Sequence, residues 1–479
     1  MNVRRAIALW GGPLGFVLCL LLLPTGGEVN QAALAGTAWW MLWWWIGGGA
    51  PIGATSLLPI ALFPLFGVMG IQEVAVPFGS KFIWLFLGGF VLALALERHG
   101  LHRRFALHLL RRIGGGPRRT LLGFMLATAL LSMWISNTAT TLMMLPMAMA
   151  VLALLEEESG PLPWGGALVL GVAYAANTGG MATLVGTPPN AALAGVASDR
   201  FGVEIGFAEW MGGGLPISAA VLTAVYFGLV RLHRFPGGKG QGATEAVVHR
   251  ELGKLGVMGT AERRVMLLFA GTALLWIFRR PLNQILAPLD FALDDTSVAV
   301  SAAVACFAVR APRSGDREGK EEALLAPEDL KRLPWDILLL FGGGLALAKG
   351  FESAGWAALL AEGAAGLGWS QWAMLVAVTG LGLFATELMS NLALTLLLTP
   401  VAGALAAGMG LHPLFFAAPV ALASSGAFML PMATPPNAIV FSSGRFRIAD
   451  MVRTGIVFNV ITLAIVLALW MVLAPEAWR

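Results

Sequence analysis

The chain has 479 residues, of which 57% are hydrophobic and 12% are charged, with a formal net charge of +4. A soluble domain carries about twice that share of charged residues, so the composition excludes an ordinary soluble protein and predicts a polytopic membrane protein. Two isolated cysteines and six scattered histidines indicate neither a disulfide framework nor a metal cluster. In so apolar a chain we interpret the arginine clusters as topology determinants and expect no nucleic-acid partner.

The first predicted element is an apolar run at 7–23, which follows Arg4 and Arg5. It resembles a signal peptide, but no clear small-residue cleavage site follows it. The next apolar run, at 33–48, comes at once. We therefore expect a retained membrane span rather than a cleaved leader.

Lys and Arg are distributed unevenly along the loops. The segments 26–30 and 156–160 contain neither residue type, whereas 98–119, 231–264 and 310–332 are rich in arginine. The positive-inside rule then places the N-terminus and the basic loops in the cytoplasm. The compact chain and its short loops favour a bacterial inner (plasma) membrane.

The segments 120–155 and 388–444 are both long and both lack Asp, Glu, Lys and Arg. The first, 120–155, has 36 residues and would be about 54 Å long as one helix, although the hydrocarbon core is only about 30 Å thick. The short polar side chains of "SNT" at 136–138 can compete for backbone hydrogen bonds and predict a break there. The second segment, 388–444, contains "SNL" at 390–392 and "TPPN" at 434–437. Because unwound backbone at membrane depth lies inside protein or beside water, these breaks predict a site.

The two halves of the chain resemble each other in order. Paired broken segments in two halves are a sequence sign of a secondary transporter, and we expect repeats at 71–232 and 265–479 joined by a polar cytoplasmic linker at 233–264. The matching segments are 86–101 with 340–356, 136–148 with 390–402, 185–194 with 432–441, and more weakly 207–211 with 448–452.

Glu387 is the only formal charge near the four motifs. A broken helix offers free N–H groups, which suit an anion, and free carbonyls, which suit a hard cation. A dianion in a site without Lys or Arg would be costly to desolvate alone, so we expect coupling to a cation. Ser and Asn could instead only join neighbouring helices, and we expect Glu387 to cap a helix end rather than carry protons. The motifs show neither an enzyme's nucleophile and base nor a channel's filter ring, so we expect no enzyme.

These motifs, together with "FLGGF", "TELMSN" and "AFMLPMATPPNAIVF", resemble the divalent anion:sodium symporter family from about Trp44 to Ala474. The resemblance implies an all-α polytopic membrane protein with two inverted repeats and about eleven transmembrane helices. It also implies a homodimer in the lipid bilayer and an elevator-type mechanism, with scaffold helices at 1–70 and re-entrant hairpins at 82–110 and 336–362.

The resemblance further implies which residues bind. Sodium ions would be the coupling ions, with no organic cofactor. One position departs from the pattern, because residue 392 is Leu where many members have Thr, and the missing hydroxyl favours a substrate of different shape or an apolar wall. The implied substrate-binding residues are Ser136, Asn137, Thr138, Thr187, Pro188, Ser390, Asn391, Leu392, Thr434 and Pro435. The implied sodium sites are Ser132, Ser136, Asn137 and Gly186 for the first, and Thr386, Met389, Asn391 and Ala433 for the second.

The function expected from these features is sodium-coupled import of a small dianion, most simply a C4-dicarboxylate such as succinate, malate or fumarate. Two alternatives stay open on the sequence. The same fold could exchange dicarboxylates without sodium, or it could carry sulfate or citrate with sodium.

Overall fold

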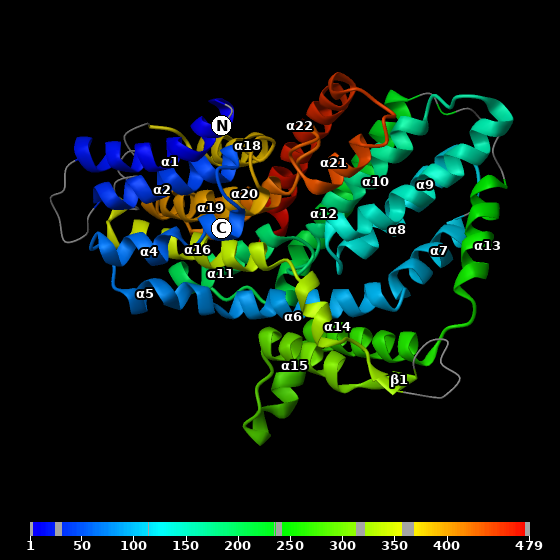
Figure 1. Ribbon diagram of the computed structural model, residues 1–479, viewed down its shortest axis with the longest axis horizontal. Helices are drawn as coiled ribbons and strands as arrows, with labels where there is room; N and C mark the ends of the chain where they lie inside the picture. Colours follow the sequence, from blue (N-terminus) through cyan, green and yellow to red (C-terminus); the bar gives the residue numbers. More distant parts are fainter. Residues whose placement is uncertain are drawn as a thin grey trace.

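The computed structural model describes residues 3–23, 31–113, 115–233, 235, 242–312, 321–356 and 368–474. Helices dominate these residues (Figure 1), which confirms the predicted all-α membrane fold. The first part of the chain forms α1 (Val3–Leu22), α2 (Gln31–Gly47), α3 (Ile52–Thr55), α4 (Leu58–Leu65), α5 (Ile71–Ala75), η1 (Val76–Gly79), α6 (Lys81–Arg98), α7 (Leu101–Ile113), α8 (Pro117–Ser132), α9 (Asn137–Ser159), α10 (Gly165–Gly180), α11 (Pro188–Phe201), α12 (Phe207–Leu232) and α13 (Ala243–Leu255). The second part forms α14 (Thr260–Leu286), η2 (Ala287–Leu289), α15 (Asp295–Ala308), β1 (Arg310–Pro312), β2 (Glu321–Ala323), η3 (Pro327–Arg332), α16 (Trp335–Ser353), α18 (Gln371–Ala385), α19 (Asn391–Gly408), α20 (Leu414–Ser424), α21 (Pro435–Phe441) and α22 (Ile448–Leu473).

Among the described residues, seven helical segments are long and apolar enough to cross a membrane. Four shorter apolar helical segments accompany them, and the chain is a multi-pass membrane protein. The seven segments are Arg5–Leu22, Ile71–Arg98, Asn137–Glu157, Phe207–Leu232, Thr260–Leu289, Asn391–Gly408 and Ile448–Leu473.

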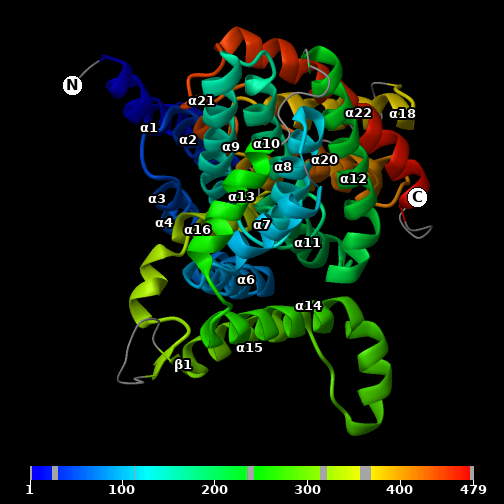
Figure 2. The same ribbon diagram turned by 90° about the vertical axis from the view of Figure 1, so that its right-hand side faces the viewer.

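The predicted hairpin at 82–110 corresponds to α6 and α7, which join through a short turn at Gly100, where φ is +70°. A side chain rarely adopts that backbone conformation, so glycine favours the turn. The predicted hairpin at 336–362 begins with α16, and its residues 357–362 lie outside the described part. Beneath α6 lies a separate layer of α14 and α15 (Figure 2), with α15 packed along α6.

The all-α prediction missed one small feature, an antiparallel pair of three-residue strands. β1 pairs with β2 in the arginine-rich segment 310–332, with Arg310 opposite Ala323. The next segment, η3, faces the turn between α6 and α7, where Asp329 pairs with Arg98. The segment 310–332 therefore holds the turn of the α6–α7 hairpin.

The tryptophan-rich helix α2 packs against the glycine-rich helix α1. Pro13 lies inside α1 and has no N–H, so the carbonyl oxygen of Leu9 lacks its usual helical donor. The indole N–H of Trp44 donates to that oxygen at 2.9 Å. The seven apolar and aromatic positions at 39–45 thus include a tryptophan that hydrogen-bonds the carbonyl left without a donor by the proline in α1.

The two halves of the chain pack reciprocally. By the sequence match, α9 corresponds to α19 and α11 corresponds to α21. The structure packs α9 against α21 and packs α19 against α11, while α12 and α22 contact each other. Each half therefore makes the same contact with the other half, as expected for repeats related by a pseudo-two-fold axis. This packing brings the broken helices of each half against the other half.

Candidate functional site

Both "SN" motifs lie at helix breaks, as predicted. α8 ends at Ser132 and α9 begins at Asn137, while α18 ends at Ala385 and α19 begins at Asn391. Ser136 precedes α9 and its hydroxyl accepts a hydrogen bond from the N–H of Ala139 at 3.2 Å. This is the usual role of serine at a helix N-terminus. The breaks leave backbone groups free for other partners.

Each motif asparagine is held by a hydroxyl across the break. Ser132 Oγ lies 2.6 Å from Asn137 Oδ1 and 2.7 Å from the carbonyl oxygen of Ala176. In the second half, Thr386 Oγ1 lies 2.6 Å from Asn391 Oδ1 and 2.8 Å from the carbonyl oxygen of Ser424. In each cluster, three oxygen atoms converge with a single hydroxyl proton among them. Neutral oxygens gathered in this way suit a hard cation.

Both "TPPN" motifs begin the second half of another broken helix. α10 ends at Gly180 before α11 begins at Pro188, and α20 ends at Ser424 before α21 begins at Pro435. Two prolines at the start of a helix remove two of its free N–H groups. These two helix starts are therefore poor in donors, whereas α9 and α19 keep theirs.

The last residue of each "TPPN" motif clamps the preceding loop. Asn190 Nδ2 donates to the carbonyl oxygens of Gly180, Met181 and Thr183 at 3.0, 3.3 and 2.7 Å. Asn437 Nδ2 donates in the same way to Ala427 O and Leu430 O. Both asparagines are buried. The sequence motif alone did not predict this role, although the position of the asparagine directly after two prolines was a signal for it.

Two glycines bring the first loop against the first motif. A Cβ atom added at Gly180 would lie 2.7 Å from Asn137 Oδ1 and 3.1 Å from the Cβ of Thr187. A Cβ atom at Gly186 would lie 2.5 Å from the carbonyl oxygen of Gly180. Larger side chains would not fit, so Asn137, Gly186 and Thr187 lie in one cluster with Ser132.

The predicted residues of the second half fall into two hydrogen-bonded groups. Thr386 is joined to Asn391, and Thr434 accepts the N–H of Asn437 at 3.3 Å. The remaining predicted residues of both halves differ in burial. The buried ones are Ala433 and Leu392, the half-buried ones are Thr138, Pro188, Met389 and Ser390, and the exposed one is Pro435. Leu392 belongs to an apolar cluster with residues of α11 and α16.

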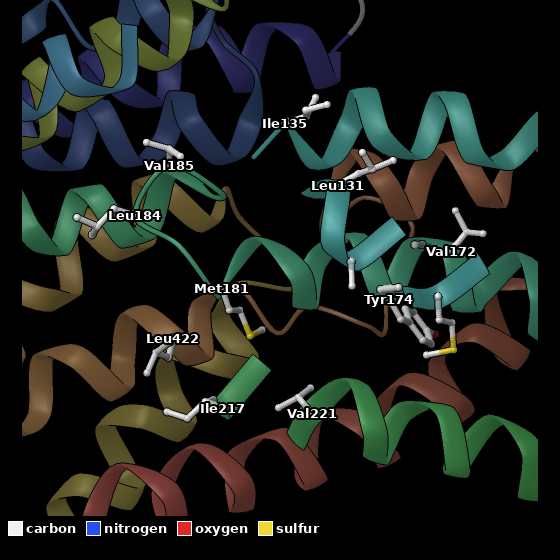
Figure 3. Packing of buried hydrophobic residues seen from close by; sticks show 14 of the residues in the cluster. Leu131, Ile135, Val172, Tyr174, Met181, Leu184, Val185, Ile217, Val221 and Leu422 are labelled. Atoms are coloured by element: carbon white, nitrogen blue, oxygen red, sulfur yellow. The ribbon is translucent and has the colours of Figure 1, made fainter. Parts of the chain in front are cut away.

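Asn177 links the two halves directly. It lies on α10 of the first half, and its Nδ2 is 3.2 Å from Ala427 O, 3.1 Å from Thr434 Oγ1 and 3.3 Å from Asn437 Oδ1. Tyr174, one turn earlier, donates its hydroxyl to the carbonyl oxygen of Phe428 at 2.9 Å. Around this link, Tyr174 belongs to the same buried apolar cluster as Met181, Ile217 and Val221 (Figure 3). No sequence motif had singled out Asn177.

Glu387 is buried and serves the unwound loop of the second half. Its carboxylate accepts the backbone N–H groups of Phe428, Met429 and Leu430 at 2.9–3.0 Å, and the side-chain amide of Asn459 at 2.7 Å. The carboxylate therefore binds backbone N–H groups as a cap would, but these groups belong to a loop and not to the helix end that we expected. Four donors on one carboxylate offset the cost of burying its charge.

Comparison with known proteins gives consistent matches over almost the whole chain. The family model described as "Sodium:sulfate symporter transmembrane region" matches residues 12–475. A sodium-dependent dicarboxylate transporter of Staphylococcus saprophyticus is 36% identical over 495 residues, covering 99% of this chain and 92% of that protein. The transporter of the same name from Staphylococcus aureus is 37% identical over 485 residues, covering 97% of this chain and 90% of that protein.

Two solved structures share the fold at low sequence identity. The YdaH transporter of Alcanivorax borkumensis matches with a TM-score of 0.56 and 15% identity, covering 99% of this chain and 100% of that one. MtrF of Neisseria gonorrhoeae matches with a TM-score of 0.54 and 14% identity, covering 98% and 95%. At this identity the likeness concerns the fold alone.

Proposed function

The chain belongs to the divalent anion:sodium symporter family, and we propose that it imports a C4-dicarboxylate together with sodium. The relatives are named transporters, and this chain is accordingly a transporter and not an enzyme. The observation that carries the proposal is the pair of matching oxygen clusters at the two "SN" breaks. Each has one hydroxyl set between an asparagine oxygen and a backbone carbonyl.

The clusters supply the ligand types that sodium requires. The first site would use Ser132, Ser136, Asn137 and Gly186, and the second would use Thr386, Met389, Asn391 and Ala433. Within the described residues, no group of three or more His, Cys, Asp or Glu is placed to hold a metal ion. Hydroxyl, amide and carbonyl oxygens are the ligands at hand, and they favour a hard monovalent cation over a transition metal.

The dianion would lie between the starts of α9 and α19. Those helices begin with Asn137 and Asn391 and keep their N–H groups, whereas prolines occupy the first two positions of α11 and α21. The carboxylates would therefore contact Ser136, Asn137, Thr138, Ser390 and Asn391. Thr187 with Pro188 and Thr434 with Pro435 would close the site, and Leu392 would form an apolar wall. Bound sodium would offset the charge of the dianion, since fixed cations are absent from these motifs.

Several further features belong to the same proposal. Residues 1–70 would form a scaffold, and the repeats at 71–232 and 265–479, joined by the cytoplasmic linker 233–264, would carry the moving part of an elevator. The protein would act as a homodimer in a bacterial inner membrane, with a cytoplasmic N-terminus. No organic cofactor would be needed.

The test is uptake of labelled succinate into proteoliposomes with sodium or choline outside. We expect uptake against a gradient with sodium and background uptake with choline. Equal uptake in both would refute sodium coupling, and a requirement for dicarboxylate inside would select the exchanger instead. Competition with malate, fumarate, citrate and sulfate then identifies the substrate, because sulfate transport is the function named in the matching family description.

A further inference from the structure

A cavity lies away from the "SN" and "TPPN" loops. It has a volume of about 590 Å³, is open on one side, and is lined by the turn between α6 and α7, the middle of α9 and the amphipathic helix α13. This volume lies within the range of about 300–1,000 Å³ that is usual for small-molecule sites. The substrate-binding residues proposed above do not line it.

One wall of this cavity is apolar. α9 contributes Leu142, Met143, Pro146 and Met147 to it, and α13 contributes Val247. Leu142 is 56% exposed although it lies on an apolar helix. Such a wall suits an acyl chain rather than a compact, strongly hydrated anion.

The opposite rim carries excess positive charge. The Glu251 carboxylate forms ion pairs with Arg103, Arg250 and Lys254. Its Oε1 lies 3.7 Å from Arg250 Nε and 2.7 Å from Lys254 Nζ. The Glu251 side chain is 10% exposed, whereas those of Arg103 and Lys254 are 39% and 60% exposed. One carboxylate therefore faces three cations. The hydrogen bond from Lys254 also lowers the pKa of Glu251, so the carboxylate keeps its charge.

The other charges at the rim are already paired outside the cavity. Arg98 pairs with Asp329, and Glu97 lies 3.5 Å from Arg332. His102 faces the carbonyl oxygen of Leu96 through Nδ1 at 3.0 Å. Arg103 and Lys254 are thus the cations with capacity for another anion.

We propose that this cavity binds a long-chain carboxylate, with its head group at Arg103 and Lys254 and its chain along the apolar wall of α9. Cation and apolar wall meet in one cavity, which matches an anionic head joined to an acyl chain. The size of the cavity suits a single chain, so a free fatty acid fits better than a two-chain phospholipid.

The test measures binding of oleate to the full-length protein in a neutral detergent by native mass spectrometry. Oleyl alcohol has the same chain without charge, and we expect it to bind about tenfold more weakly. Arg103→Gln combined with Lys254→Gln should weaken oleate by about the same factor and leave oleyl alcohol unchanged. Ala150→Phe, which fills the cavity, should weaken both ligands.

One variant should act in the opposite direction. Glu251→Gln keeps the hydrogen-bonding shape but frees the cations, so oleate should bind several-fold more tightly. Arg447→Gln, at an exposed ion pair elsewhere, is the matched control and should change nothing. Size-exclusion profiles and unfolding temperatures check that each variant is folded.

Four results would overturn the proposal. Equal binding of oleate and oleyl alcohol would remove the role of charge, and unchanged binding in Ala150→Phe would remove the cavity. Displacement of oleate by succinate alone, or preference for dioleoyl phosphatidylglycerol over oleate, would assign the cavity to a different ligand.

Discussion

In the first half, Thr183 donates its hydroxyl to the backbone carbonyl of Met133 at 2.5 Å, joining the "TPPN" loop to the "SN" break. At the matching positions of the second half stand Leu430 and Glu387, and there the backbone N–H of Leu430 donates to the Glu387 carboxylate at 3.0 Å. The same two positions are hydrogen-bonded in both halves. In the first half the loop contributes a side chain and the break a backbone carbonyl, whereas in the second half the loop contributes a backbone N–H and the break a side chain. The join is therefore retained while the chemistry that makes it differs.

A second difference concerns what holds each loop from outside. Asn437 Oδ1 accepts a hydrogen bond from Asn177 Nδ2 of the other half. The corresponding Asn190 Oδ1 is buried and has no hydrogen-bond partner among the described residues. The loop of the second half is thus tied to the first half. The loop of the first half is held by contacts within its own half, which are the Asn190 clamp, Thr183 on the Met133 carbonyl and Trp210 on the Met181 carbonyl. We infer that the second loop depends more on cross-repeat contacts.

The largest expected effect tests what the halves share. Asn137→Ala and Asn391→Ala each remove the amide at the centre of an oxygen cluster, so each should reduce sodium-driven succinate uptake by about 100-fold. Initial rates in proteoliposomes measure this loss. The control is Thr223→Ala, which removes an exposed hydroxyl on α12 and should transport normally. Full activity in either asparagine variant would show that its cluster is not part of the site.

The next prediction tests the hydrogen bonds between loop and break, which the two halves form with different groups. Glu387→Met places in the second half the residue type found in the first, and it leaves three backbone N–H groups without their acceptor. We expect a loss of unfolding free energy of about 3 kcal/mol or more. Thr183→Val removes one hydrogen bond and should lose about 1–2 kcal/mol. Thermal unfolding of the purified proteins compares them, with Met133→Leu as the conservative control. A smaller shift for Glu387→Met than for Thr183→Val would contradict the assigned roles.

A third prediction concerns the tie between halves. Asn177→Ser shortens the side chain that reaches Thr434 and Asn437, so the second loop should close less readily over sodium. We expect the sodium concentration for half-maximal uptake to rise about tenfold, with a smaller change in maximal rate. Thr272→Ala is the control, because the buried Thr272 hydroxyl donates to the carbonyl of Leu268 in its own helix, α14, away from the site. An unchanged sodium dependence in Asn177→Ser would leave the residue a purely structural role.

The smallest effect is expected at Leu392, which stands in the second half at the position that Thr138 occupies in the first. Leu392 is only 4% exposed and packs in an apolar cluster, so Leu392→Thr should shift relative preference among dicarboxylates by a few-fold. It should also lower stability by about 1–3 kcal/mol, because a buried hydroxyl needs a partner. A competition panel measures the preference. An identical panel would show that the side chain does not reach the substrate.

The helix breaks could be predicted from the sequence because the uncharged segments are longer than one membrane span requires. An uncharged segment of 36 residues is too long for one span, and a polar tripeptide at its middle marks the interruption. The repeat was visible because two polar motifs recur in the same order. The roles of Ser132 and Thr386 came only through the family resemblance, since a single hydroxyl in a membrane helix carries little signal of its own.

The contacts across the halves were beyond that reasoning. Asn177 lies 257 residues before Thr434, and nothing in either local pattern indicates that they meet. The amide clamps of Asn190 and Asn437 depend on the loop folding back over itself, which periodicity does not report. The strands at 310–312 and 321–323 were missed because three-residue strands leave no pattern to detect.

The reciprocal packing of α9 on α21 and α19 on α11 has a consequence for how such a chain could have arisen. An interface in which the same two surfaces meet twice is the interface of a symmetric dimer. A half-length ancestor could have formed this contact between two separate copies inserted in opposite directions. Joining the copies in one gene would then have freed each half to change alone, which is how Met133 and Glu387 could come to differ while the contact between loop and break survived.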